Sequence, residues 1–277
     1  MTTGARPAAG YRPSPLMIRI LSGSAILLIV IGLVYVGLPG VYVLVLVIGT
    51  LAIWEFRNLS DRMGSRAPSW LVYPLAVFFA LSGTLLKAIP VELVLSVALV
   101  FGLGAFLFLP GRRQGLGRWA MGLSGAIYIG MPFNFYLLLY LHSLAWVLFI
   151  LCAVVVSDTA ALLVGSRLGR HPFFQAISPK KTVEGAIAGV LFCIPVMILG
   201  AFGVLALPWY HAVILGVLVG VSAELGDLVE SQMKRIAGVK DSSHLIPGHG
   251  GVLDRIDSVL FPPIVVFFYA EFLHLLH

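Results

Sequence analysis

Residues 143–165 read SLAWVLFILCAVVVSDTAALLVG, an apolar run interrupted by a single carboxylate, Asp158. A helix needs about 20 apolar residues to cross a bilayer, so this run has the length of a transmembrane helix. The whole chain of 277 residues is 60% hydrophobic and only 11% charged. That composition is typical of membrane proteins and disfavours a soluble globular fold. We therefore predict an all-α, polytopic integral membrane protein without a separate soluble domain.

Other runs share this hydropathy, so we predict about nine transmembrane helices in total. Their expected bounds are 17–37, 39–56, 70–88, 91–109, 119–141, 143–165, 182–206, 210–232 and 256–276. The second run follows the first after a very short connection, which predicts a tight helical hairpin. Pro132 is expected to break the fifth helix. The polar, Pro- and Gly-rich residues 1–16 are predicted to form a disordered cytoplasmic tail.

The placement of Lys and Arg predicts the orientation of these helices, because cytoplasmic loops carry an excess of both. With the N-terminus in the cytoplasm and the C-terminus outside, nearly all of these residues fall in cytoplasmic segments and only Lys87 is left outside. The net charge of +6 is therefore mostly a topology signal and gives no evidence for a nucleic-acid partner. We predict a multi-pass protein of the cell inner (plasma) membrane whose polar site faces the cytoplasm.

Carboxylates inside a membrane are costly and mark functional sites by default. The predicted helices carry theirs near the cytoplasmic end: Asp158, Glu184, Glu224, Asp227, Glu230, Asp254 and Asp257. A spacing of three residues keeps the acids of each helix on one face. Glu184, Glu224 and Glu230 have an alternative use as hydrogen-bond partners of neighbouring helices, and Asp254 has one as a surface partner of Arg255.

Two polar segments flank these acids. Residues 231–257, SQMKRIAGVKDSSHLIPGHGGVLDRID, combine four bases with aspartates and a glycine-rich turn around His249. Bases suit phosphates, carboxylates suit a hard cation, and glycines let the backbone approach a ligand. In residues 178–185, SPKKTVEG, Ser178 is predicted to cap a helix that begins at Pro179, which creates an anion site next to Lys180 and Lys181. The alternative for the two lysines is a positive-inside anchor. Together the segments predict a phosphorylated substrate at the membrane edge.

The motif S231-x-x-KR, KD at 240–241, PGHGG at 247–251 and DRID at 254–257 resembles the signature of the phosphatidate cytidylyltransferases, or CDP-diacylglycerol synthases. LGDL-x-ES at 225–231 and SP-x-KT-x-EG at 178–185 resemble two further motifs of this family. The detailed likeness covers residues 154–260. Leu162 stands where the family usually has tyrosine, Ser166 where it has arginine, and Ser243 with His244 where Gly-Asn is common.

The resemblance implies that the chain transfers the cytidylyl group of CTP to phosphatidic acid, giving CDP-diacylglycerol and pyrophosphate. Residues 17–141 would be N-terminal transmembrane helices, and 142–277 a catalytic transmembrane region with cytoplasmic loops at 166–181 and 233–255. The implied partners are CTP, phosphatidic acid and membrane lipids, and a homodimer is left open.

The resemblance also implies roles for individual residues. Asp227, Asp254 and Asp257 would hold Mg2+, with a second metal ion left open, and Lys234 and His249 would complete the catalytic group. The remaining residues would contact substrate: Asp158, Ser178, Lys181, Ser231, Arg235, Lys240, Asp241, Gly250, Gly251 and Arg255.

Three alternatives remain at this point. The first is a paralogue that uses a related phospholipid acid, and the second is a CTP-dependent polyprenol or phytol kinase. The third belongs to another class: an ion-coupled secondary transporter with acids along its ion path. A transporter would explain Asp158 and Asp227 but not residues 231–257.

Overall fold

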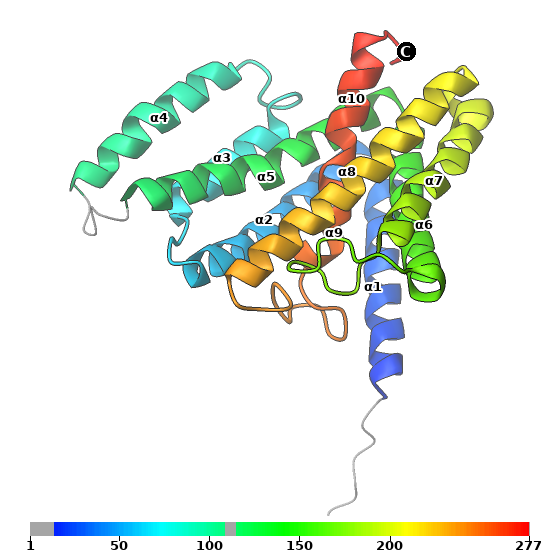
Figure 1. Ribbon diagram of the computed structural model, residues 1–277. Helices are drawn as coiled ribbons and strands as arrows, with labels where there is room; N and C mark the ends of the chain where they lie inside the picture. The colour runs from blue at the N-terminus through cyan, green and yellow to red at the C-terminus, as the bar shows by residue number, and fades with distance from the viewer. Residues whose placement is uncertain (1–13, 109–114, 277) are drawn as a thin grey trace, which may run out of the picture.

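The computed structural model describes residues 14–108 and 115–276, and in these residues it is built from helices without any strand (Figure 1). The predicted all-α fold is thereby confirmed. The helices are α1 Pro15–Tyr35, α2 Leu38–Arg62, α3 Ser69–Leu81, α4 Val91–Phe108, α5 Gly115–His142, α6 Leu144–Leu168, α7 Val183–Gly200, α8 Trp209–Ile236, α9 Leu253–Leu260 and α10 Pro262–Phe272. A π-helical turn, Ala201–Leu205, extends α7.

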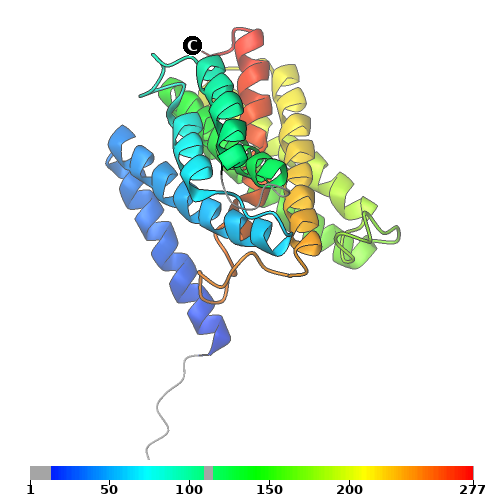
Figure 2. The ribbon, with the colours of Figure 1, turned by 90° about the vertical axis from the view of Figure 1, so that its left-hand side faces the viewer.

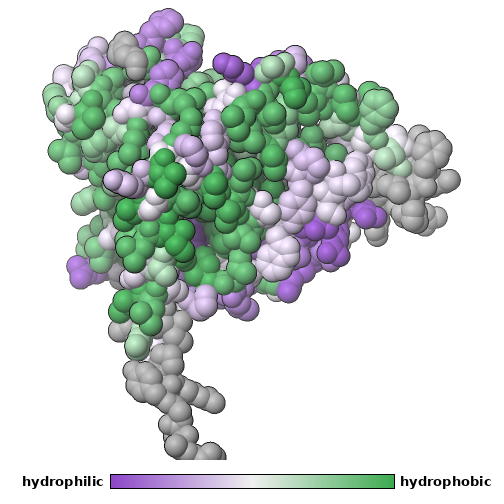
Figure 3. Space-filling model, turned by 180° about the vertical axis from the view of Figure 1, so that it is seen from behind, coloured by the Kyte–Doolittle hydropathy of each residue, from purple (hydrophilic) through white to green (hydrophobic). Residues whose placement is uncertain are grey.

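The protein is an all-α membrane protein. Within the described ranges, five helices are long and apolar enough to cross a membrane: α2, α5, α6, α8, and α7 with its π-helical turn. Shorter apolar helices lie at Ile20–Tyr35, Ser69–Leu81 and Val91–Ala105. Apolar side chains cover much of the outer surface, as lipid contact requires (Figure 3). The total of nine spans and their direction stay predictions.

Three expectations from the sequence are wrong. The third apolar run ends as a helix at Leu81, and residues 82–88 form turns. The ninth run is divided between α9 and α10, because Pro262 and Pro263 begin a new helix and cannot donate backbone hydrogen bonds to the preceding one. Pro132 does not break α5, which continues through it to His142. Packed neighbouring helices commonly allow an internal proline in this way.

The tail predicted over residues 1–16 lies mostly outside the described residues. Its last part, from Pro15, already belongs to α1.

Glycines set the closest helix contacts around the site. A Cβ at Gly189 in α7 would lie 2.9 Å from Ser157 Oγ of α6, and one at Gly216 in α8 would lie 2.6 Å from the Ile194 Cα of α7. Gly185 and Gly220 face α6 and α7 at similarly short range. The sequence pairs Gly185/Gly189 and Gly216/Gly220 are thus confirmed as packing positions, as small residues at membrane helix contacts usually are. At these glycines, α6, α7 and α8 pack closely against one another.

The first two helices form the predicted hairpin, with Gly37 at a φ of 83° in the turn. α1 diverges from α2 along its length, so the start of α1 lies beside the loop 237–252 rather than beside α2 (Figure 2). The loops 169–182 and 237–252 lie at the end of the bundle where α1 begins, and the C-terminus lies at the opposite end (Figure 1). Both polar segments singled out in the sequence therefore meet at one end of the molecule.

Candidate active site

A polar pocket of about 720 Å³ lies between α6, α7, α8 and α9 at this end of the bundle. Its charged lining residues are Asp158, Lys180, Lys181, Glu224, Asp227, Lys234, Asp241, Asp254, Arg255 and Asp257. Six of these are acids and four are bases, so the pocket has an excess of negative charge that favours a bound cation. The structure thus brings together most of the site residues expected from the sequence.

The close approach of α9 to α8 creates the acidic wall of the pocket. A side chain at Gly226 would collide with the backbone carbonyl of Asp257, so glycine lets the two helices pack next to Asp227. Asp257 Oδ1 accepts hydrogen bonds from its neighbour Ser258, at 2.7 Å from the amide and 3.1 Å from the hydroxyl. The same hydroxyl lies 3.4 Å from Asp158 Oδ2. Ser258 therefore links the acids of α6 and α9.

Lys181 faces this acidic wall from the loop 169–182. Its Nζ lies 2.6 Å from both Glu224 Oε2 and Asp227 Oδ2. Burial lowers the pKa of Lys181, but the two carboxylates outweigh that effect and raise it, so the side chain is a fixed cation. Ser231 Oγ donates to the other carboxylate oxygen of Asp227, Oδ1, at 3.2 Å. Glu224 thus forms an ion pair with a lysine and does not only hydrogen-bond to a neighbouring helix.

The start of α7 differs from the sequence expectation. Thr182, not Ser178, caps the helix, and its Oγ1 accepts from the Gly185 amide at 3.2 Å. Ser178 belongs to the preceding loop, where its carbonyl accepts from the Lys181 amide at 3.1 Å. The predicted helix start at Pro179 is wrong because these turn hydrogen bonds compete with the helix, and a second cap residue follows at Thr182. Glu184 then anchors the loop by accepting from the amides of residues 170 and 171 at 3.0 and 3.2 Å.

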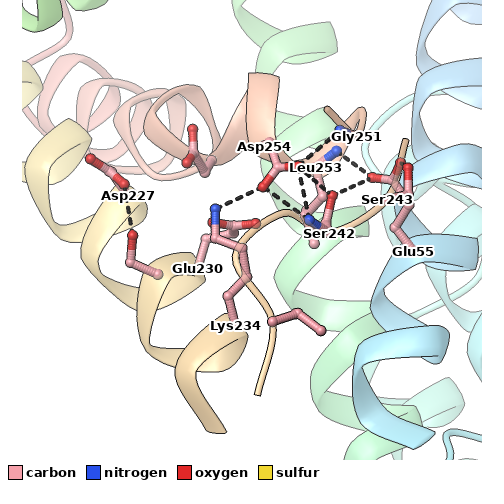
Figure 4. A network of polar contacts seen from close by, with 12 residues as sticks. Glu55, Asp227, Glu230, Lys234, Ser242, Ser243, Gly251, Leu253 and Asp254 are labelled. Atoms are coloured by element: carbon pink, nitrogen blue, oxygen red, sulfur yellow. Dashed lines mark hydrogen bonds and ion pairs between the residues drawn. The ribbon is translucent and has the colours of Figure 1, made fainter. Parts of the chain in front are cut away.

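Lys234, which lines the same pocket, lies between Glu230 and Asp254 (Figure 4). It forms an ion pair with Glu230, four residues earlier on α8, and its Nζ lies 2.7 Å from Asp254 Oδ1. Glu230 is fully buried, and the ion pair is its only partner within the described part of the chain. A buried carboxylate of this kind requires its cation, so Lys234 has a charge-balancing role as well as a place in the pocket.

Asp254 organises the loop 237–252. Its Oδ2 accepts from the Gly251 amide at 2.8 Å and from the Ser242 amide at 2.9 Å. The Ser242 hydroxyl shares its one proton between Asp254 Oδ2 at 2.9 Å and Glu55 Oε2 at 3.1 Å. Burial raises the pKa of Asp254, but the hydrogen bonds from Lys234 and Gly251 outweigh it and hold the pKa at about 2. Its ion-pair partner is Lys234, not Arg255. A metal-binding role for Asp254 stays a prediction, since these donors already engage both of its oxygens.

A second pocket of about 620 Å³ lies under the glycine-rich turn. Asp241 and Arg255 line both pockets, so the two are neighbours, and the second adds Lys240, His244 and His249. Its turn needs glycine, because Gly248 and Gly250 have φ values of 76° and 83°. Because Lys240 and Arg255 face only one acid, Asp241, among the described residues of the second pocket, that pocket is the more basic of the two and suits an anion.

His249 contacts the first helix. Ser22 Oγ of α1 donates to the carbonyl of Pro247 at 3.0 Å and lies 3.1 Å from His249 Nδ1. The glycine-rich turn is thereby joined to α1.

Four predicted site residues line neither pocket. Ser231 supports Asp227, and Ser178 stays in its loop. Arg235 donates to the carbonyls of Ile177 at 2.9 Å and Val239 at 3.2 Å, so it ties the two loops together. Gly251 leaves room for a carboxylate: a Cβ there would lie 2.6 Å from Glu55 Oε1. These residues shape the pockets from outside.

Glu55 of α2 is the residue that the sequence reasoning missed. It is fully buried and accepts from the hydroxyls of Ser242 and Ser243 at 3.1 and 2.6 Å. It also accepts from the amides of Val252 and Leu253 at 2.9 and 2.6 Å (Figure 4). A lone carboxylate inside the apolar run 39–56 is itself a signal of function. The motifs that resemble the family lie within residues 154–260, so Glu55 was not among the predicted site residues.

The acids of the first pocket suit Mg2+ in one particular way. Within the described ranges, no three acidic, His or Cys side chains converge closely enough to hold a metal ion. Mg2+ commonly takes one or two carboxylates and completes its shell with water and substrate phosphates. Asp227 and Asp257, which line the same pocket, fit that mode.

Comparison with known proteins agrees with this chemistry. The pattern of the Cytidylyltransferase family matches residues 17–273. The chain belongs to the cytidylyltransferase family. Over 166 residues it is 35% identical to a protein named phosphatidate cytidylyltransferase from Staphylococcus haemolyticus, and over 167 residues 36% identical to one of that name from Staphylococcus aureus. Each match covers 60% of this chain and 64% of the relative. The family resemblance seen in the motifs is thereby confirmed.

Proposed function

We propose that this protein transfers the cytidylyl group of CTP to phosphatidic acid, giving CDP-diacylglycerol and pyrophosphate. The observation that carries the proposal is the pair of neighbouring polar pockets, which share Asp241 and Arg255 at one end of an apolar helical bundle. One pocket has an excess of acids, with Lys181 half-buried and Lys234 buried among them, and the other is basic. A nucleoside triphosphate with a cation and a lipid phosphate together need both kinds of environment.

The reaction needs few protein groups. An oxygen of the lipid phosphate attacks the α-phosphorus of CTP, the bond from that phosphorus to the α–β bridging oxygen breaks, and pyrophosphate leaves. The nucleophile is already an anion, so no Ser-His-Asp arrangement is required. The task is to bring anions together and neutralise charge, as in other phosphoryl transfers. Bound Mg2+ would supply charge neutralisation at the phosphates, held by Asp227 and Asp257.

The remaining residues have binding roles in this proposal. Lys181 and Lys234 are partly buried cations that face the first pocket, and they would attract the reacting phosphates. Lys240, Arg255 and His249 would bind phosphates of CTP in the second pocket. Asp158 would orient the acidic wall through Ser258.

The proposal includes a topology. We propose nine membrane segments in the cell inner (plasma) membrane, with the N-terminus and both loops in the cytoplasm and the C-terminus outside. The segregation of Lys and Arg supports this direction. The common position of the two loops, opposite the C-terminus, also supports it (Figure 1).

Purified protein with labelled CTP, phosphatidic acid and Mg2+ tests the function. We expect a labelled CDP-lipid and one pyrophosphate per lipid formed. Incubation with a polyprenol or phytol in place of phosphatidic acid tests the kinase alternative, which would yield a phosphorylated lipid without nucleotide. Absence of any CTP-dependent product, combined with ion-dependent uptake in vesicles, would contradict the proposal in favour of a transporter.

A further inference from the structure

We propose that Glu55 of α2 is a positioning residue that holds the loop 237–252 in the conformation that forms the two pockets. The loop carries Lys240, Asp241 and His249, and it leads directly into Asp254. Every donor that contacts Glu55 comes from this loop or from the first residue of α9. The inferred effect on activity rests on the proposed function, whereas the inferred effect on loop order does not.

Glu55 contacts both ends of the loop, and we call this set of contacts the clamp. Glu55 accepts from Ser242 and Ser243 near the start of the loop, and from Val252 and Leu253 at its end. A carboxylate offers about four acceptor positions, and Glu55 has three donors of its own, from Ser243, Val252 and Leu253, and a fourth, the Ser242 hydroxyl, that it shares with Asp254. One side chain thus joins residues ten positions apart and closes the loop into a ring (Figure 4).

The end of the loop needs such a partner. The first amides of a helix have no acceptor within the helix, and α9 receives no side-chain hydrogen bond from its own N-cap residue, Val252. Glu55 supplies the missing acceptor from another helix, and its negative charge suits the positive end of α9. The start of α9, and hence Asp254, is thereby fixed in position.

α2 is a rigid base for this clamp. Ile53, two residues before Glu55, and Phe56, one residue after it, are 2% and 3% exposed and belong to the main core. The clamp also explains a glycine of the loop, because a Cβ at Gly251 would collide with both the Ser242 hydroxyl and the Glu55 carboxylate. Glu55 therefore transmits the fixed position of the N-terminal helices to the pocket walls.

Hydrogen exchange and activity, measured on the same full-length variants in detergent or nanodiscs, test the proposal. The variants are Glu55→Ala, Glu55→Gln and Ser243→Ala, the last of which removes one donor on the loop side. Ser60→Ala is the matched control. Ser60 is a buried residue of the same helix, but its hydroxyl donates to Arg57 and accepts from the Ala67 amide, away from the loop.

In Glu55→Ala we expect amides of residues 242–253 to exchange at least about tenfold faster, with those of α5 unchanged. The value of kcat/KM for CTP should fall at least about tenfold. Glu55→Gln and Ser243→Ala should show smaller effects in the same segment, because some acceptors or donors remain. Adding Ser243→Ala to Glu55→Ala should have less effect than Ser243→Ala alone, since their shared interaction is already lost and only the contact of the Leu245 amide with Ser243 Oγ remains to be removed.

Wild-type exchange of residues 242–253 in Glu55→Ala, or equal acceleration in Ser60→Ala, would overturn the clamp. If Glu55→Ala does not accumulate as folded protein, Glu55→Gln and Ser243→Ala decide by the same measure, and unchanged loop exchange in both overturns it. A wild-type protein that makes no CDP-lipid would refute the proposed function instead, and the exchange result would still stand.

Discussion

The backbone carbonyl of Asp257 lies against the α-carbon of Gly226, at the point where α9 crosses α8. Gly226→Ala would force the two helices apart, which we expect to cost about 1–3 kcal/mol of stability and to remove activity. Gly104→Ala is the control, because a Cβ at Gly104 meets nothing within 4 Å. Thermal unfolding in detergent and turnover of both variants check this. Equal behaviour of the two would contradict the close packing at Gly226.

Asp257→Asn and Asp227→Asn should each abolish turnover while folded protein still accumulates. Each change removes one negative charge from the proposed Mg2+ site at nearly constant shape. A metal ion contributes several kcal/mol to transition-state stabilisation, so we expect a loss of at least about a hundredfold. Asp61→Asn, which alters an exposed ion pair with Arg66 and lines neither pocket, is the control. Near-normal turnover by either site variant at matched expression would exclude its metal role.

Asp254→Asn should behave differently from Asp257→Asn. Asp254 accepts backbone hydrogen bonds from Ser242 and Gly251, so its replacement should accelerate amide exchange across residues 242–253 as well as reduce turnover. Asp257→Asn should leave that exchange unchanged. Exchange mass spectrometry on both variants distinguishes them. If Asp254→Asn lost activity with a fully protected loop, its role would be direct metal or substrate binding.

Lys181→Ala should reduce kcat/KM roughly ten- to a hundredfold, because a charge-assisted contact contributes about 1.5–3 kcal/mol. Lys181 is half-buried and paired with Glu224 and Asp227, whereas Lys180 is exposed. Lys180→Ala should therefore have a much smaller effect. Kinetics of both variants, with a labelling check of membrane insertion, test this. Equal and small losses would indicate a topology anchor rather than a phosphate contact.

The topology predicts opposite labelling at two exposed positions. In a protein with Cys152 and Cys193 replaced, His244→Cys should react with a membrane-impermeant maleimide only from the cytoplasm. Ala88→Cys should react only from outside. Both sites are exposed, so access depends on the side of the membrane and not on burial. The reverse pattern would invert the orientation and separate the pockets from cytoplasmic CTP.

Hydropathy predicted the helices well where one apolar run forms one straight helix, as in residues 143–165. It failed where backbone chemistry decides the outcome. Pro262 and Pro263 divide the last run although its hydropathy is continuous. Conversely, Pro132 lies within α5 without ending it. Apolar character specifies what is buried in lipid or protein, but it does not specify where the hydrogen bonds of a helix stop.

The same limit applies to the site. Residue types and motifs predicted that Asp158, Lys181, Asp227 and Asp257 would meet, and they line one pocket. Their partners were not predictable by spacing. Lys181 reaches α8 from a loop 43 residues earlier, and Glu55 is 198 residues from the amide of Leu253. Such pairings depend on how the helices pack, which no local pattern encodes.

The capping of α9 by an acid from α2 has a consequence for dissection of the chain. A fragment beginning at residue 142 retains every motif that resembles the known enzymes, yet it lacks the only side chain among the described residues that receives the Val252 and Leu253 amides. We expect such a fragment to insert but to leave the loop before α9 unordered. Co-expression with residues 1–141 as a separate polypeptide should restore it, and a Glu55→Ala version of that polypeptide should not.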